Sequence, residues 1–142
     1  MLALAACTPG APAAGAGRAA AATTTIDVSL TSSPSSATAY GSAGGFAPAV
    51  TTVAVGATVR FVNVDSFAHT ASALGTAVFP AASPLGSAAL NVSGATLSAG
   101  WSSGTLGSGA ASQALLADRA GTYLYGCFFH YGAPMRGAIV VR

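Results

Sequence analysis

Hydrophobic and polar residues alternate along several short stretches of the chain. Residues 26–30 alternate Ile, Val and Leu with Asp and Ser, and residues 58–63 place Val59, Phe61 and Asn63 on one face. A period of two is typical of a strand with one face in a core. The same pattern predicts further strands at residues 53–55, 113–116, 123–127 and 137–141.

Turn-forming residues separate these stretches. Pro34 lies in a Ser cluster, Gly56 follows one predicted strand, and Gly121 precedes another. Short strands between turns predict an all-β fold, an antiparallel β-sandwich of about seven or eight strands. Residues 80–90 contain two Pro and a Gly, so we expect them to form a loop with at most one short helical turn.

The N-terminal region has a different composition. Residues 8–23 consist mainly of Ala, Gly and Pro and contain no bulky side chain that could pack in a core. They are interpreted as a disordered linker ahead of a single domain at residues 24–142. No stretch approaches the ~18 apolar residues that a membrane helix needs.

The first seven residues end in Leu-Ala-Ala-Cys, which resembles the lipobox of bacterial lipoproteins. The resemblance implies cleavage before Cys7 and attachment of lipid to it. Only six residues precede this Cys, whereas signal peptides run to ~15–30 residues, so residues 1–7 are interpreted as a truncated signal remnant. We expect a periplasmic or extracytoplasmic protein that meets the membrane only through this anchor; the alternative is a free Cys on a disordered tail.

Charged residues are scarce: the chain has five Arg, three Asp, no Lys and no Glu, which gives a net charge of +2. So few cations form no basic stripe, and this argues against nucleic acid as a partner. It also predicts that association with other proteins depends only weakly on salt.

The chain contains two His, one Met besides Met1, and one Cys outside its first ten residues. All of them fall in residues 63–70 and 125–137, as His69, Cys127, His130 and Met135. A chain so poor in nitrogen and sulfur ligands that gathers them in two segments is most simply interpreted as a metal protein. Two His, one Cys and a weak axial Met describe a blue copper centre for electron transfer.

The properties of these ligands favour a carrier over an enzyme. The Cys127 thiolate and the Met135 thioether favour Cu(I), and the two imidazoles keep Cu(II) acceptable. Four protein ligands leave no open position for a substrate. We therefore expect one type 1 copper ion, single-electron transfer and no catalysis.

The C-x₂-H-x₄-M spacing of residues 127–135 resembles the cupredoxin family, with a ligand loop of the plastocyanin type. Residues 46–63, 121–125 and 136–142 resemble the family's strands around the ligands. The resemblance covers residues 24–142 apart from an insertion at about 72–100. It implies a Greek-key sandwich in which His69, Cys127 and His130 are equatorial ligands and Met135 is the axial one.

Neighbouring residues are expected to support and expose this site. Thr70 is a candidate to hydrogen-bond the ligand loop, and Asn63 and Asp65 to fix the turn before His69. An apolar patch around His130 is expected to bind redox partner proteins transiently. Its residues are Phe67, Phe128, Phe129, Tyr131 and Pro134. A monomer is expected.

The residues leave three other interpretations open. A copper-binding protein for delivery, storage or tolerance is the main alternative, although the Met-rich or His-rich tracts typical of such proteins are absent. A copper-free structural sandwich is a second. A cysteine nucleophile with His130 as its base is a third, and no third group to orient the base is evident.

Overall fold

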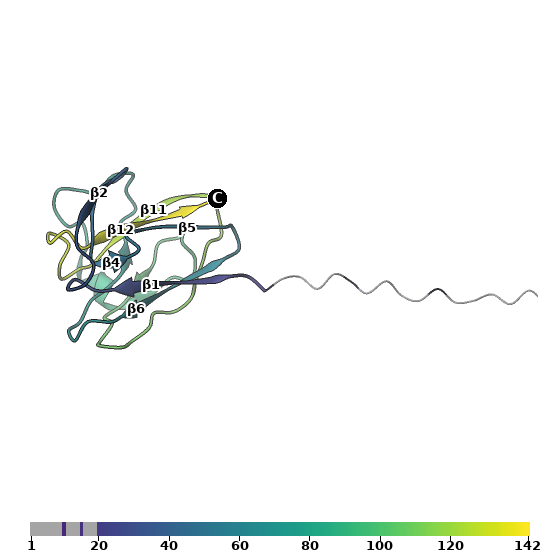
Figure 1. Cartoon of the computed structure of the whole chain (residues 1–142), viewed down its shortest axis with the longest axis horizontal. Helices are drawn as coiled ribbons and strands as arrows, with labels where there is room; N and C mark the ends of the chain where they lie inside the picture. The colour runs from purple at the N-terminus through teal and green to yellow at the C-terminus, as the bar shows by residue number, and fades with distance from the viewer. Residues whose placement is uncertain (1–9, 11–14, 16–19) are drawn as a thin grey trace, which may run out of the picture.

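The computed structural model describes residues 10, 15 and 20–142 (Figure 1). The predicted signal remnant, with Cys7, and most of the predicted linker and disordered tail lie outside the described residues. Among the described residues, no helix has the length and apolar character to cross a membrane.

Two sheets pack face to face, as the strand pattern predicts. One sheet has the order β10–β6–β1–β4, and the other has the order β5–β12–β11–β7–β9–β8. The first contains β1 (Thr23–Val28), β4 (Phe46–Ala47), β6 (Thr58–Asn63) and β10 (Leu115–Leu116). The second contains β5 (Val50–Val53), β7 (Ser72–Ala73), β8 (Val92–Ser93), β9 (Ser102–Ser103), β11 (Gly121–Gly126) and β12 (Arg136–Val141). A hairpin of β2 (Ser36–Thr38) and β3 (Gly41–Ala43) completes the fold.

The sheets are mixed rather than purely antiparallel. β1 runs parallel to β6, and β5 runs parallel to β12, whereas the other pairs are antiparallel. Both parallel pairs join strands that are distant in sequence, so no tight hairpin forces them to be antiparallel. The alternating pattern predicts which face of a strand is buried, but not the direction of its neighbour.

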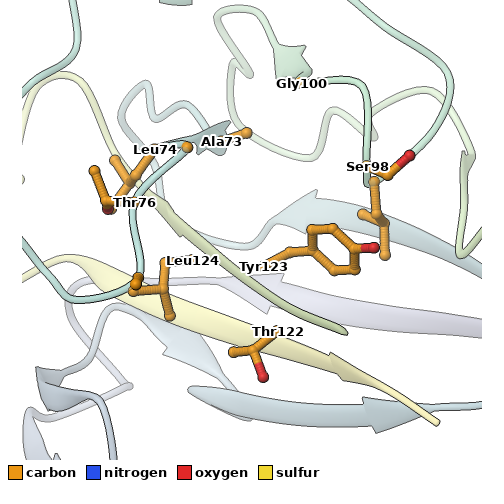
Figure 2. Close-up of a pocket in the computed structure, with 11 residues that line it drawn as sticks. Ala73, Leu74, Thr76, Ser98, Gly100, Thr122, Tyr123 and Leu124 are labelled. Carbon is orange, nitrogen blue, oxygen red and sulfur yellow. The ribbon is translucent and has the colours of Figure 1, made fainter. Parts of the chain in front are cut away.

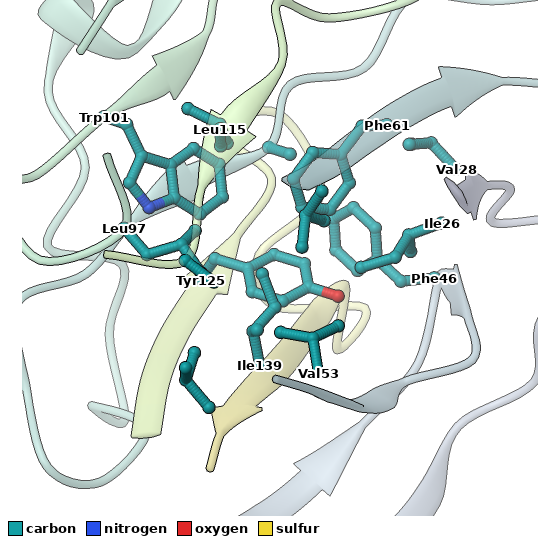
Figure 3. Packing of buried hydrophobic residues seen from close by; sticks show 14 of the residues in the cluster. Ile26, Val28, Phe46, Val53, Phe61, Leu97, Trp101, Leu115, Tyr125 and Ile139 are labelled. Carbon is teal, nitrogen blue, oxygen red and sulfur yellow. The ribbon is translucent and has the colours of Figure 1, made fainter. Parts of the chain in front are cut away.

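The core between the sheets is rich in aromatic rings (Figure 3). Phe61 stacks on Trp101 with ring centroids 5.3 Å apart, and Tyr125 meets Phe46 edge-on at 4.8 Å. Both arrangements are favourable for aromatic quadrupoles. Phe61 belongs to the buried face of β6, which the period of two predicts, and it joins one sheet to the other.

The insertion at residues 72–100 is more ordered than a plain loop. It contributes β7, between β11 and β9, and the edge strand β8 to the six-stranded sheet, and it includes a short 3-10 helix, η1 (Ser87–Leu90). The short helical turn considered for residues 80–90 is this 3-10 helix.

The topology brings two segments to one end of the sandwich. β6 ends at Asn63 in one sheet, and β11 ends at Gly126 in the other. The residues that follow these strands meet, because Thr70 N lies 3.4 Å from Cys127 Sγ. The fold therefore joins the two segments in which the sequence concentrates its His, Cys and Met.

Candidate metal centre

His69, Cys127 and His130 come together at this end of the sandwich. Nδ1 of His69 lies 3.9 Å from Cys127 Sγ, and Nδ1 of His130 lies 3.7 Å from it. The potential ligand atoms of the three residues all lie within 4.8 Å of one another. One thiol faced by two imidazole nitrogens is a donor set that fits copper.

Met135 is fully buried in the same core cluster as Cys127. Cys127 N donates to Met135 O at 3.1 Å, and Met135 N donates to His130 O at 3.1 Å. The two ends of the loop are therefore hydrogen-bonded to each other. Gly45 has a φ of +73°, and a Cβ there would overlap Met135 Cγ. The missing side chain at Gly45 therefore provides the space that the Met135 side chain occupies.

Thr70 links the two segments that carry the donors. Its N–H points at Cys127 Sγ at 3.4 Å, and its Oγ1 accepts a hydrogen bond from Phe128 N at 2.8 Å. A backbone N–H directed at the sulfur stabilises negative charge on it. The same residue thus contacts the thiol and holds the start of the ligand loop.

Asn63 organises the turn that leads to His69. Its Nδ2 donates to Phe67 O at 2.8 Å and to Leu106 O at 2.9 Å, and its Oδ1 accepts from Asp65 N at 2.9 Å. The amide is fully buried, so these bonds have no competition from water. Asn63 lies on the inward face of β6 and is the last residue of that strand, so its amide can bond the turn that follows.

Asp65 makes a contact that the sequence analysis missed. Its Oδ2 lies 2.8 Å from Nε2 of His69 and accepts from Leu30 N at 2.7 Å. Its Oδ1 accepts from the hydroxyls of Ser29, at 2.8 Å, and of Thr31. Burial of the carboxyl acts to raise its pKa, but the four hydrogen bonds outweigh burial and hold the pKa of Asp65 well below its usual range. The only local signal was an Asp four residues before a His.

His130 lies nearer the surface than His69. Its ring centroid is 5.0 Å from that of His69, 5.6 Å from Phe67 and 6.1 Å from Phe129. Partial burial lowers the pKa of His130, the neighbouring His69 lowers it further, and Asp65 opposes the shift. The neutral imidazole, which is the form that binds metal, is therefore favoured.

Apolar side chains surround the exposed edge of His130. Phe67 is 39% exposed and Phe129 is 45% exposed, while Phe128 and Pro134 are half-buried. Val64, at 53% exposure, lies in the segment that leads to Phe67 and was not among the predicted patch residues. Phe67 and Phe129 are thus both exposed and close to the His130 ring.

Tyr131 was expected in the patch, and this expectation is wrong. The residue is only 3% exposed, and a Cβ on Gly126 would lie 2.8 Å from its ring. Its hydroxyl donates to Pro80 O at 2.8 Å, and the Arg136 guanidinium lies 4.5 Å from its ring centroid. The ring is buried because Gly126, Arg136 and the insertion all pack against it.

A cavity lies elsewhere in the molecule (Figure 2). It has a volume of about 500 Å³ and is lined by residues 73–77, Leu97, Ser98, Gly100 and residues 122–124. None of the four donor residues lines it. It lies between β11 and the two ends of the insertion, away from the cluster of donors.

Residues 36–142 match the model of a family described as copper binding proteins of the plastocyanin/azurin type. The chain belongs to this family. The expected resemblance to cupredoxins and the expected copper cofactor are thereby confirmed. No curated protein matches the sequence significantly.

Solved structures share the fold of this cupredoxin. A purple cupredoxin from Nitrosopumilus maritimus superposes with a TM-score of 0.54 at 21% identity, over 84% of this chain and 99% of the other. The Cu(I) form of a Met-to-Ala mutant of amicyanin gives 0.51 at 19% identity, over 87% and 85% of the two chains. At these identities the likeness establishes the fold alone.

Proposed function

We propose that this cupredoxin is a single-electron carrier with one type 1 copper ion. His69, Cys127 and His130 are the equatorial ligands and Met135 is the axial one. The observation that carries the proposal is the convergence of two Nδ1 atoms on one buried thiol beside a buried Met. The wider membership in a copper-binding family supports it.

Bound copper supplies a one-electron Cu(II)/Cu(I) couple. The residues of the chain keep the donor geometry constant during this exchange. Thr70 holds the loop against the Cys127 thiol, and the loop closes on itself between Cys127 and Met135. Four protein donors leave no position for a substrate, which is why we propose a carrier and no enzyme.

Electrons enter and leave through the exposed edge of His130. Phe67 and Phe129 surround this edge with apolar surface that a partner desolvates easily. A small apolar contact binds weakly and releases quickly, which suits a carrier that alternates between donor and acceptor. We propose that the protein acts as a monomer and that its partners bind here with little dependence on salt.

Copper titration of the purified apoprotein, followed by visible absorption and electron paramagnetic resonance, tests the proposal. We expect an intense thiolate-to-copper band that reaches its maximum at one equivalent and is absent in Cys127→Ser. The loaded protein should be reduced and reoxidised repeatedly without losing copper. Transfer of Cu(I) to a chelating acceptor during these cycles would indicate a delivery protein instead.

The axial ligand has its own test. Met135→Leu should keep the thiolate-to-copper band and raise the reduction potential, because a weak donor to Cu(II) is lost. A tenfold change in the equilibrium constant of reduction corresponds to about 59 mV for a one-electron couple. An unchanged potential would show that Met135 is not the axial ligand.

We also propose that the protein is periplasmic or extracytoplasmic and carries lipid on Cys7. The support is the Leu-Ala-Ala-Cys sequence alone. Metabolic labelling with a radioactive fatty acid should mark the wild-type protein made from its full gene, and Cys7→Ser should abolish the label. Equal labelling of both proteins would refute the anchor.

A further inference from the structure

The hydrogen bonds of Asp65 determine which nitrogen of His69 carries its proton. Leu30 N–H can only donate, and it points at the same carboxylate oxygen that meets Nε2 of His69. A carboxylate that receives a backbone N–H and two hydroxyls is in its ionised form, which only accepts hydrogen bonds. Nε2 of His69 must then be the donor. Nδ1 is left with a free lone pair, 3.9 Å from Cys127 Sγ.

This pair is rigid because it is buried and anchored on both sides. His69 is 0% exposed and Asp65 is 4% exposed. Ser29 and Leu30 attach the carboxylate to the end of β1, and Asn63 holds its backbone N–H. Rotation of the imidazole would break its bond to Asp65 with no water to replace it, which is costly for a buried group.

The carboxylate also adds a negative charge close to the donors. With copper bound, the oxidised ion, the Cys127 thiolate and the Asp65 carboxylate together are neutral. Reduction by one electron from a partner makes the same group singly negative. A buried net charge is unfavourable, so the carboxylate opposes reduction.

We propose that Asp65 is a positioning residue of the copper centre. It holds His69 as the Nε2–H tautomer with Nδ1 free for the metal, and its charge lowers the reduction potential. The effect on the potential rests on the proposed function, whereas the tautomer is a property of the apoprotein.

Asp65→Asn tests the effect on the potential, because the amide keeps the shape of the side chain and removes its charge. We expect the thiolate-to-copper band to persist and the equilibrium constant of reduction to rise at least tenfold, which is about 59 mV. Asp118→Asn is a matched control, since Asp118 also accepts hydrogen bonds from a backbone N–H and a hydroxyl, both of Ser98. The control should leave the potential unchanged. An Asp65→Asn potential equal to that of the wild type would overturn the proposal.

A second measurement does not depend on whether Asp65→Asn folds. In apo His130→Ala, His69 is the only imidazole of the chain, and its ring ¹⁵N chemical shifts identify the protonated nitrogen. We expect the proton on Nε2; a proton on Nδ1 would overturn the proposal. If the wild type formed no thiolate-to-copper band, the proposed function would fail, and this experiment would still decide the tautomer.

Discussion

The two imidazoles of the site both place Nδ1 near Cys127 Sγ, but they differ in burial and in the groups that surround them. His69 is completely buried, and its Nε2 is bonded to a carboxylate that belongs to a network reaching β1. His130 is partly exposed, lies in a loop and is surrounded by the rings of Phe67 and Phe129. The difference shows how one site combines a fixed geometry with an accessible edge: the buried side fixes His69, and the loop side leaves His130 partly exposed, where we propose that partners bind.

The largest effect is expected when each imidazole is removed in turn. His130→Gly should regain its thiolate-to-copper band when imidazole is added, because the space opens to solvent. His69→Gly should not, because its space is enclosed and Asp65 loses its buried partner. Absorption during an imidazole titration measures both. Equal rescue of the two variants would contradict the assignment of a buried and an accessible side.

Removal of the support beneath His69 should cost stability. Asn63→Ala leaves Phe67 O and Asp65 N without their hydrogen-bond partner, while Leu106 O loses one of its two bonds and keeps the one from His69 N. Unsatisfied buried groups of this kind predict a loss of about 2–3 kcal/mol in the free energy of unfolding. Urea denaturation of the apoprotein checks this. A loss below about 0.5 kcal/mol would mean that the turn does not depend on the amide.

The hydrogen bond of Thr70 that links the two segments should contribute less to the free energy of unfolding. Thr70→Val keeps the shape of the side chain and removes the acceptor for Phe128 N. We expect a loss of about 1 kcal/mol in the free energy of unfolding, the typical net value of one hydrogen bond. Thr52→Val, at an exposed position of β5, is a matched control and should change stability by less. Equal effects would show that the link contributes nothing.

The smallest effect on stability is expected on the accessible side. Phe129→Ala should change the free energy of unfolding by no more than about 0.5 kcal/mol, because the ring is 45% exposed. It should nevertheless slow electron exchange with a redox partner several-fold, measured by stopped-flow absorption. Val92→Ala removes a more exposed apolar side chain, at 66% exposure on β8, and should leave the rate unchanged. Equal rates for both variants would exclude Phe129 from the docking surface.

Sequence alone predicted the features that depend on local pattern. The period of two located the buried face of β6, and the scarcity of His, Cys and Met directed attention to four residues, three of which the structure brings together. The missed features depend on partners far along the chain. Tyr131 is buried through Pro80, 51 residues away, and Asp65 is held by Ser29, 36 residues away. No periodicity encodes such contacts, just as none encodes the parallel pairing of β1 with β6.

The contacts of Tyr131 have a consequence for protein engineering. Because its hydroxyl bonds to Pro80 O and Arg136 lies over both Tyr131 and Phe79, the ligand loop and the insertion are one mechanical unit. A chimera that received a relative's loop in place of residues 127–135 would leave that part of the insertion without the surface on which it rests. Grafting experiments in this molecule must therefore transfer or redesign both segments together.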